Sequence, residues 1–183
     1  MLVNTDMNSL IKRIDNCSKC KLCKYRNNIV FGKGNMNADI MLIAEAPGYE
    51  EDKTGIPFMG RSGKIIDEAL EVANITRNDV YITNIVKCRP PKNRNPIQEE
   101  INTCIDYLRN EVYLVKPKVI ILLGGVPLKE IIGKNYFITK VRGTLINKNN
   151  ILYLPTYHPA AVLRDSNKKM DFINDFIKAT NVK

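Results

Sequence analysis

Four of the chain's five cysteines are spaced so that their thiolates can converge on one metal centre: Cys17, Cys20, Cys88 and Cys104. The first two form a C-x-x-C pair, which lets two thiolates reach one ion or one cluster corner from a single tight turn. The second two are far away in the sequence, but a long loop adds little entropic cost once a fold exists. Because the chain has one histidine, a four-thiolate zinc ion or an iron-sulfur cluster is favoured over a mixed site, with iron and zinc left undecided.

A secreted disulfide scaffold is disfavoured by three features of the sequence. The number of cysteines is odd, the segment Met1–Asp6 does not resemble an apolar leader, and no apolar run is long enough to span a bilayer. We therefore expect a cytoplasmic protein without a membrane partner. Buried, inert thiols remain the alternative to a metal centre.

The charge of the chain points to a nucleic-acid partner. With 28 Lys and Arg against 19 Asp and Glu, the net charge is +9, which is large for 183 residues. Two basic clusters surround the cysteines: Lys19, Lys21, Lys24 and Arg26 near the first pair, and Lys87, Arg89, Lys92 and Arg94 near Cys88. Such clusters are typical of a phosphate-binding surface. The alternative is an ordinary solvated, lysine-rich face.

The apolar pattern predicts the elements that must position these residues. Continuous apolar runs at 39–44, 80–86, 118–123 and 151–154 are typical of parallel strands buried on both faces. Helical spacing follows at 62–70, where Ser62 is the expected cap, at 97–114, which carries Cys104, after Gly125, and from about Lys168. We expect one domain, residues 1–183, folded as a three-layer α/β/α sandwich around a mostly parallel four-stranded sheet.

Ligands of such sheets bind beyond the carboxyl ends of the strands. The first strand ends in the acidic segment 44–52, the second ends near Asn84, and the fourth leads to His158. We therefore expect Asn84, His158, Phe58 and the acidic segment to meet at one rim.

At these segments the chain resembles the family-four uracil-DNA glycosylases of the iron-sulfur type. The resemblance rests on the order and spacing of Cys17-x-x-Cys20, Phe31-Gly32-x-Gly34-Asn35, Glu45-Ala46-Pro47-Gly48, Pro57-Phe58-x-Gly60, the run from Tyr81 to Pro91, Cys104 and His158-Pro159-Ala160. It implies the same α/β sandwich and a 4Fe-4S cluster held by Cys17, Cys20, Cys88 and Cys104. Cys23 is given no ligand role.

The resemblance also implies a pocket for a uracil that is flipped out of the duplex. We expect Phe58 to stack on the base, and the Asn84 amide to pair with uracil O4 and N3–H while opposing cytosine. We expect His158 to donate a hydrogen bond to O2, where negative charge develops. The alternatives are a core phenylalanine, an asparagine that ties its own loop, and a structural histidine.

Further roles are expected around this pocket. Glu45 is expected to position the water, Glu51 to line the uracil site, and the main chain around Ala46 to add hydrogen-bond donors. The loop 160–164 is expected to approach DNA, with Leu163 wedged into the duplex and Arg164 on a phosphate. The helix start at Ser62 offers N–H groups to another phosphate. The alternatives are an apolar helix start that packs on the core at 160–164, and ordinary helix capping at Ser62.

The expected function is that of a monomeric, monofunctional glycosylase. It would act on uracil-containing DNA in base-excision repair, release free uracil, and leave an abasic site. One rival is a non-catalytic iron-sulfur module that binds nucleic acid through the same pocket. A second is a redox or zinc scaffold with no uracil chemistry.

Overall fold

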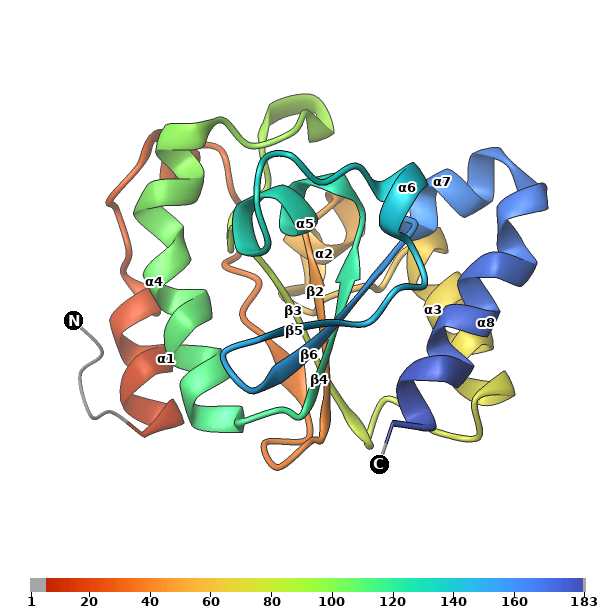
Figure 1. Cartoon of the computed structure of the whole chain (residues 1–183). Helices are drawn as coiled ribbons and strands as arrows, with labels where there is room; N and C mark the ends of the chain where they lie inside the picture. The colour runs from red at the N-terminus through yellow and green to blue at the C-terminus, as the bar shows by residue number, and fades with distance from the viewer. Residues whose placement is uncertain (1–5, 183) are drawn as a thin grey trace.

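A six-stranded sheet lies between two layers of helices in the computed structural model, which describes residues 6–182 (Figure 1). The strand order is β1-β3-β2-β4-β6-β5. The bounds are β1 Lys33–Gly34, β2 Ile40–Ala44, β3 Val80–Asn84, β4 Val119–Leu123, β5 Ile146–Lys148 and β6 Ile151–Thr156.

The four central strands are the four that the apolar runs predict, and they are parallel to one another. The predicted α/β sandwich is confirmed, but the count of four strands is wrong. Two short strands, β1 and β5, pair antiparallel with β3 and β6 at the edges of the sheet. They have two and three residues and are mostly exposed, so they lack the apolar run by which a buried strand is recognised.

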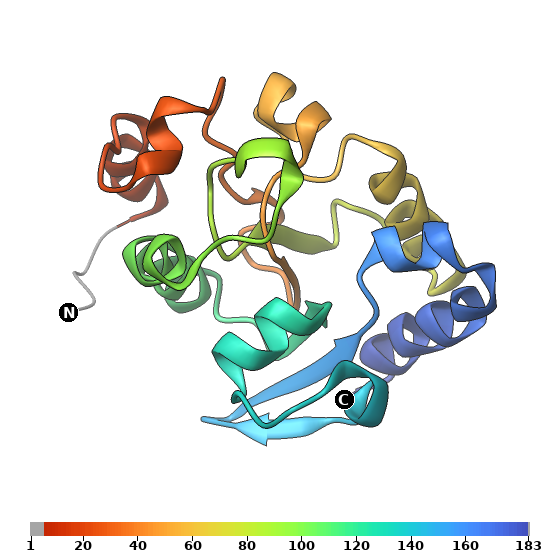
Figure 2. The same cartoon turned by 90° about the horizontal axis from the view of Figure 1, so that it is seen from above.

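The helices divide between the two faces of the sheet. In the view from above, α1, α4 and α5 lie on one side and α3 and α8 on the other (Figure 2). The bounds are α1 Met7–Asp15, α2 Tyr49–Thr54, α3 Arg61–Val72, α4 Gln98–Val115, α5 Gly125–Ile131, α6 Ile138–Val141, α7 Pro159–Arg164 and α8 Lys169–Thr180, with short 3₁₀ turns at Lys21–Lys24, Pro91–Asn93 and Ser166–Lys168. Within residues 6–182, no helix has the length and apolar character needed to cross a membrane.

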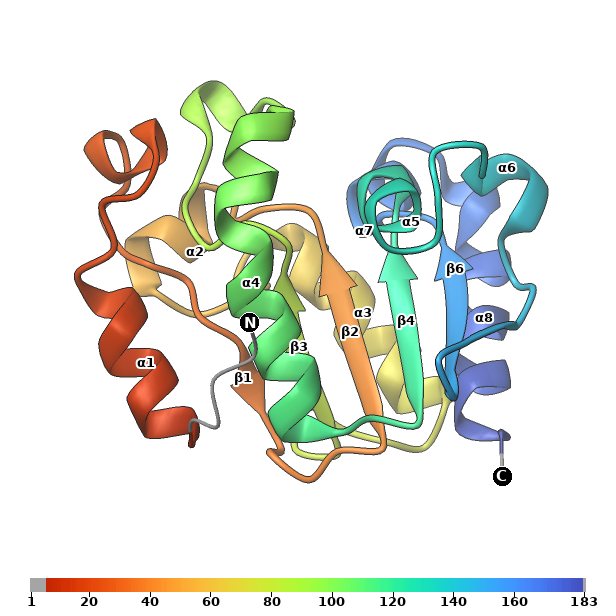
Figure 3. The same cartoon turned by 60° about the vertical axis from the view of Figure 1, so that its left-hand side comes forward.

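Alternation along each central strand fills both layers of the core. In β2, Met41 and Ile43 pack toward the α4 side, whereas Ile40 and Leu42 pack in the cluster that includes Phe172 of α8. Successive side chains of a strand point to opposite faces, so a strand covered on both sides is apolar throughout. All four central strands point to the same edge, beside which α2 and α7 lie (Figure 3).

Two local predictions about helix starts are wrong. Helix α3 begins one residue before Ser62, and its N-cap is Gly60, which makes no side-chain capping bond. Residues 160–164 are not a loop but belong to α7, with Val162 in the core, which agrees with the alternative of an apolar helix start. Pro159 occupies the first turn of that helix, where its missing N–H costs nothing, and His158 is the N-cap.

Candidate active site and cysteine cluster

A cavity of about 760 Å³ opens at the carboxyl edge of the sheet. It is lined by all nine residues predicted to handle the base, the water or the DNA: Glu45, Ala46, Glu51, Phe58, Ser62, Asn84, His158, Leu163 and Arg164. They come from the segment after β2, from α2 and α3 and the turn between them, from the end of β3, and from α7 and its N-cap. Parallel strands bring these distant segments to one place because their carboxyl ends share an edge.

Asn84 is the last residue of β3 and is 2% exposed. Its main-chain carbonyl accepts a hydrogen bond from Lys87 at 2.7 Å. Within the part of the chain that the structure describes, its side-chain amide has no partner, although it lines the cavity. Buried amides are nearly always hydrogen-bonded. A buried amide that lines a cavity and has no partner among the described residues is therefore available to hydrogen-bond a ligand in that cavity.

Phe58 is held in an unusual backbone conformation. Its φ is +56°, in the left-handed region that non-glycine residues rarely adopt. Arg77 fixes this turn, because its guanidinium donates to the carbonyl of Phe58 at 2.7 Å and of Pro57 at 3.2 Å. A Cβ at position 63 would lie 1.8 Å from the Phe58 carbonyl oxygen, so Gly63 is required there. Strained residues held by several contacts cluster at functional sites.

His158 stands opposite Phe58, with ring centroids 6.5 Å apart. Its Nδ1 accepts a hydrogen bond from the Ala160 amide at 3.1 Å, so the proton of the neutral imidazole is on Nε2. Burial, and secondly the charge of Arg164, lower the pKa of His158 to about 4 against an opposing effect of Glu51. The imidazole is therefore neutral at pH 7 and has one N–H to donate.

The carboxylates of the acidic segment have different tasks. Asp52 is fully buried. Its carboxylate accepts hydrogen bonds from the main-chain N–H and the side-chain amide of Asn27. Glu51 accepts from the Gly60 amide at 3.0 Å, which helps to place the turn that follows Phe58. Glu45 has no hydrogen bond to its carboxylate among the described residues, and burial raises its pKa. The Glu50 carboxylate also lacks a hydrogen bond among the described residues but is exposed, so Glu45 is the more buried of the two carboxylates free to contact a water.

The rim of the cavity carries groups that can meet a DNA strand. Leu163 is 45% exposed on α7, while its neighbour Val162 packs in the core. Another part of the lining comes from Pro90, Asn93, Arg94 and Asn95, which the sequence did not single out for this cavity. Directly before this segment, Arg89 lies 5.0 Å over the ring of Tyr49, which lines the cavity. Neither residue lies in a pattern that indicates this contact, which depends on the fold.

All five cysteines line one small second cavity: Cys17, Cys20, Cys23, Cys88 and Cys104. Cys17 follows α1, and Cys104 belongs to α4. Burial raises the pKa of Cys88, and raises that of Cys104 to about 12. Within residues 6–182, no three His, Cys, Asp or Glu side chains are arranged to hold a metal ion. The thiols therefore surround a common space but are not gathered at bonding distance.

One member of the predicted basic clusters cannot contact DNA. Lys87 is fully buried and forms an ion pair with Glu111, so its inclusion in a phosphate-binding surface is wrong. Arg94 is engaged as well, since it pairs with Glu100 at 2.7 Å. Arg26 donates to the Cys88 sulfur at 3.4 Å. The basic residues near the cysteines thus serve the interior as well as the surface.

The fold and the larger cavity define an α/β protein whose site can hold a flat polar ring between an unpaired amide, an aromatic ring and a neutral imidazole. The chain belongs to the uracil-DNA glycosylase superfamily, because the family model described as "Uracil DNA glycosylase superfamily" matches residues 31–180. Cys17 and Cys20 lie before the matched region.

Individual relatives give the same family. The chain is 42% identical to the type-4 uracil-DNA glycosylase of Sulfurisphaera tokodaii, over 94% of this chain and 84% of the relative. It is 42% identical to the type-4 uracil-DNA glycosylase of Thermotoga maritima, over 90% of this chain and 86% of the relative. It is 29% identical to the type-5 uracil-DNA glycosylase of Pyrobaculum aerophilum, over 82% of this chain and 80% of the relative.

Proposed function

We propose that this protein is a monofunctional uracil-DNA glycosylase that acts in base-excision repair. It takes a flipped uracil nucleotide into the 760 Å³ cavity, hydrolyses the N-glycosidic bond, and leaves an abasic site. The observation that carries the proposal is the buried Asn84 amide, which has no partner in the described residues and lies in the same cavity as Phe58 and His158. We also propose that residues 1–183 form one domain that acts as a monomer.

Base recognition follows from two side chains. The Phe58 ring provides an apolar surface for the uracil ring. The Asn84 amide donates to O4 and accepts from N3–H, while cytosine presents the opposite pattern at these two atoms. Main-chain N–H groups around Ala46 add donors, although Pro47 supplies none. Glu51 supports the site from the side, through the turn at Gly60.

Cleavage leaves a positive sugar and a negative uracil, whose charge accumulates on O2. His158 is neutral and carries its proton on Nε2, so it donates a hydrogen bond to O2 as the charge develops. A preorganised donor of this kind commonly supplies the largest catalytic contribution. The excess positive charge on the sugar makes it reactive toward water, and a strong base is not required.

We assign the positioning of that water to Glu45. Burial raises the pKa of Glu45 above its ordinary value, so its carboxylate form is lost as the pH falls toward that raised value. We expect the rate of uracil release by wild-type protein to fall more between pH 7 and pH 5 than the rate of Glu45→Gln, whose side chain cannot titrate. Single-turnover rates across this pH range test the prediction, and parallel pH profiles for the two proteins would contradict the role of Glu45.

Glu45→Ala should also lose less activity than the Asn84→Ala/His158→Ala double variant, measured in the same single-turnover assay.

DNA is held at the rim of the cavity. Leu163 enters the gap left by the flipped base, Arg164 contacts a phosphate, and the start of α3 at Ser62 offers N–H groups to another. The helix that carries Leu163 keeps Val162 in the core, so the exposed leucine is held on a supported element.

We propose that Cys17, Cys20, Cys88 and Cys104 hold a 4Fe-4S cluster. All four line one cavity, thiolates are the usual ligands of such clusters, and Arg26 places positive charge beside Cys88. Burial raises the pKa of Cys20, Cys88 and Cys104, whereas a bound metal deprotonates the thiols that coordinate it. The cluster ties the segment after α1 to α4 and to the chain after β3, and its role is structural.

The recognition role of Asn84 is tested by Asn84→Ala in a single-turnover assay of uracil release from a labelled oligonucleotide. Loss of the amide should slow release by about 10- to 100-fold, because the base loses two hydrogen bonds in a buried site. Asn102→Ala, on the surface of α4, serves as the matched control. An Asn84→Ala rate equal to that of wild type would contradict the assignment.

A further inference from the structure

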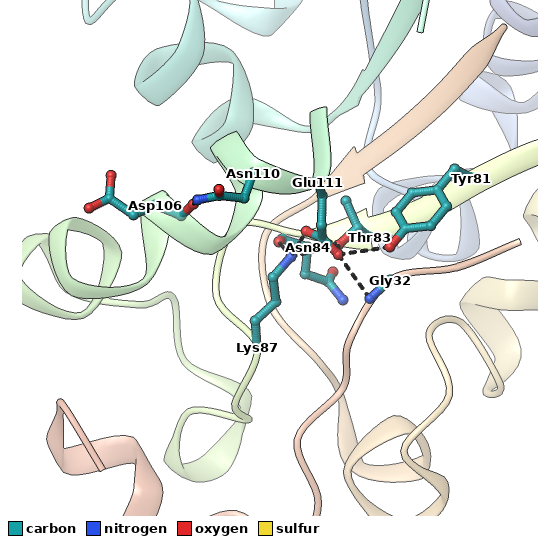
Figure 4. Close-up of polar contacts among 8 residues, drawn as sticks. All are labelled: Gly32, Tyr81, Thr83, Asn84, Lys87, Asp106, Asn110 and Glu111. Atoms are coloured by element: carbon teal, nitrogen blue, oxygen red, sulfur yellow. Dashed lines mark hydrogen bonds and ion pairs between the residues drawn. The ribbon is translucent and has the colours of Figure 1, made fainter. Parts of the chain in front are cut away.

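Lys87 and Glu111 form an ion pair in the interior of the protein, and both residues are 0% exposed. The ammonium donates to the Thr83 hydroxyl at 2.6 Å, to the Asn84 main-chain carbonyl at 2.7 Å, and to the Glu111 carboxylate (Figure 4). An ammonium group has three N–H donors. All three are therefore committed to the protein's own groups.

The Glu111 carboxylate is fixed from the other side. It lies on α4 and accepts hydrogen bonds from the Gly32 amide at 3.0 Å and the Tyr81 hydroxyl at 3.1 Å. The Thr83 hydroxyl is 3.0 Å from each carboxylate oxygen. A Cβ at position 32 would lie 2.5 Å from Oε1 of Glu111, so only glycine fits there. The carboxylate has one position, and it determines the position of the ammonium.

Stability alone gives little reason for this pair. Desolvation of two charges is costly, and a well-packed apolar pair of the same volume is often as stable. What the pair supplies is a fixed main chain where β3 ends. The Ile85 amide continues the pairing with β2 by donating to the Ala44 carbonyl at 2.9 Å, while Lys87 bonds the Asn84 carbonyl. The peptide from which the Asn84 side chain projects is thereby held.

We propose that Lys87, fixed by Glu111, is a positioning residue for Asn84. Lys87 does not touch the base. By bonding the Asn84 carbonyl it keeps the amide within hydrogen-bond reach of the flipped uracil. This inference rests on the proposed function of Asn84 in the cavity. Lys87 also lines the cysteine cavity and directly precedes Cys88, so its effect on the active site has to be separated from an effect on the cluster.

A double-mutant cycle makes the separation. Single-turnover uracil release is measured for wild type, Lys87→Met, Asn84→Ala and the double variant, with iron content recorded for each. We expect Lys87→Met to slow release by about 10- to 100-fold, as small misplacements at active sites do. In the Asn84→Ala background the same change should alter the rate by no more than about twofold, since the residue through which it acts is absent. Lys118→Met, which removes the exposed pair with Asp39, is the matched control and should leave the rate unchanged.

The outcomes are distinct. If wild type releases uracil but the losses from Lys87→Met and Asn84→Ala multiply, the positioning role is overturned while the proposed function stands. If wild type releases none, the proposed function fails and this inference with it. The neutral variant Lys87→Met/Glu111→Gln leaves no unpaired buried charge and is put through the same cycle. If Lys87→Met alone does not fold or loses its iron, this neutral variant replaces it in the cycle. Losses that multiply with Asn84→Ala again overturn the positioning role, and losses that do not multiply support it.

Discussion

Replacing His158 by alanine is expected to slow uracil release by about 100- to 1000-fold, the usual cost of removing one preorganised donor from a developing oxyanion. The substitution removes the Nε2 proton that the hydrogen bond from Ala160 to Nδ1 defines. It also removes the ring that faces Phe58 across the cavity. Single-turnover rates at saturating enzyme measure the chemical step without product release. Equal rates in His158→Ala and wild type would end the oxyanion role.

The low pKa of His158 gives this prediction a second, independent readout. Burial lowers the pKa to about 4, below the ordinary value of about 6.5 in an unfolded chain. The unfolded state therefore binds a proton between these values when the folded state does not, so this contribution to stability is complete above pH 6.5 and is lost as the pH falls toward 4. The free energy of unfolding, measured with urea, should therefore fall more for wild type than for His158→Gln between pH 7 and pH 5. Equal losses would contradict the burial of a neutral imidazole.

Loss of one cluster ligand is expected to have the second large effect, on the fold rather than on the chemistry. Cys88→Ser should abolish the brown colour, lower Tm by at least about 10 °C and weaken DNA binding. The reason is that, through the proposed cluster, Cys88 would connect the chain after β3 to the segment after α1 and to α4, whose cysteines line the same cavity. Iron analysis, thermal unfolding and DNA binding at fixed salt measure the three effects.

Cys23→Ser is the matched control for this prediction. Cys23 lines the same cavity but is not one of the four proposed ligands, so its replacement should keep iron and stability. A Cys88→Ser protein with full iron, Tm and DNA affinity would refute the cluster assignment. A colourless but active wild-type protein would refute iron in favour of another metal or none.

The parts of the fold that the sequence predicts are those with a local signal. Four strands are buried on both faces and therefore read as continuous apolar runs, as β2 and β4 do. Strands β1 and β5 are held by main-chain pairing at the sheet edges, and such pairing leaves no trace in side-chain type. Ser62 is the cap that the sequence predicts for α3, because serine is a strong N-cap, but the helix begins at Arg61, with Gly60 as its N-cap.

The site shows the same division. The positions of Asn84, Glu45 and His158 at one rim were predictable because each lies at the end of a recognisable strand or shortly after it, and parallel topology brings strand ends together. The support of these residues was not predictable. Arg77 reads as an ordinary charged residue, yet it holds the Phe58 turn. Lys87 reads as part of a basic cluster, yet its burial depends on Glu111, 24 residues away. Contacts between distant segments decide which charge faces solvent.

The central claim is most directly tested by incubating the purified, iron-loaded protein with matched oligonucleotides that carry uracil or cytosine at one position. The products are measured as free base and as alkali-labile abasic sites. The proposed function predicts equal amounts of free uracil and abasic site from the first oligonucleotide, and neither free base nor abasic sites from the second. Binding of the uracil oligonucleotide without release of the base would contradict the claim and favour a non-catalytic nucleic-acid-binding module.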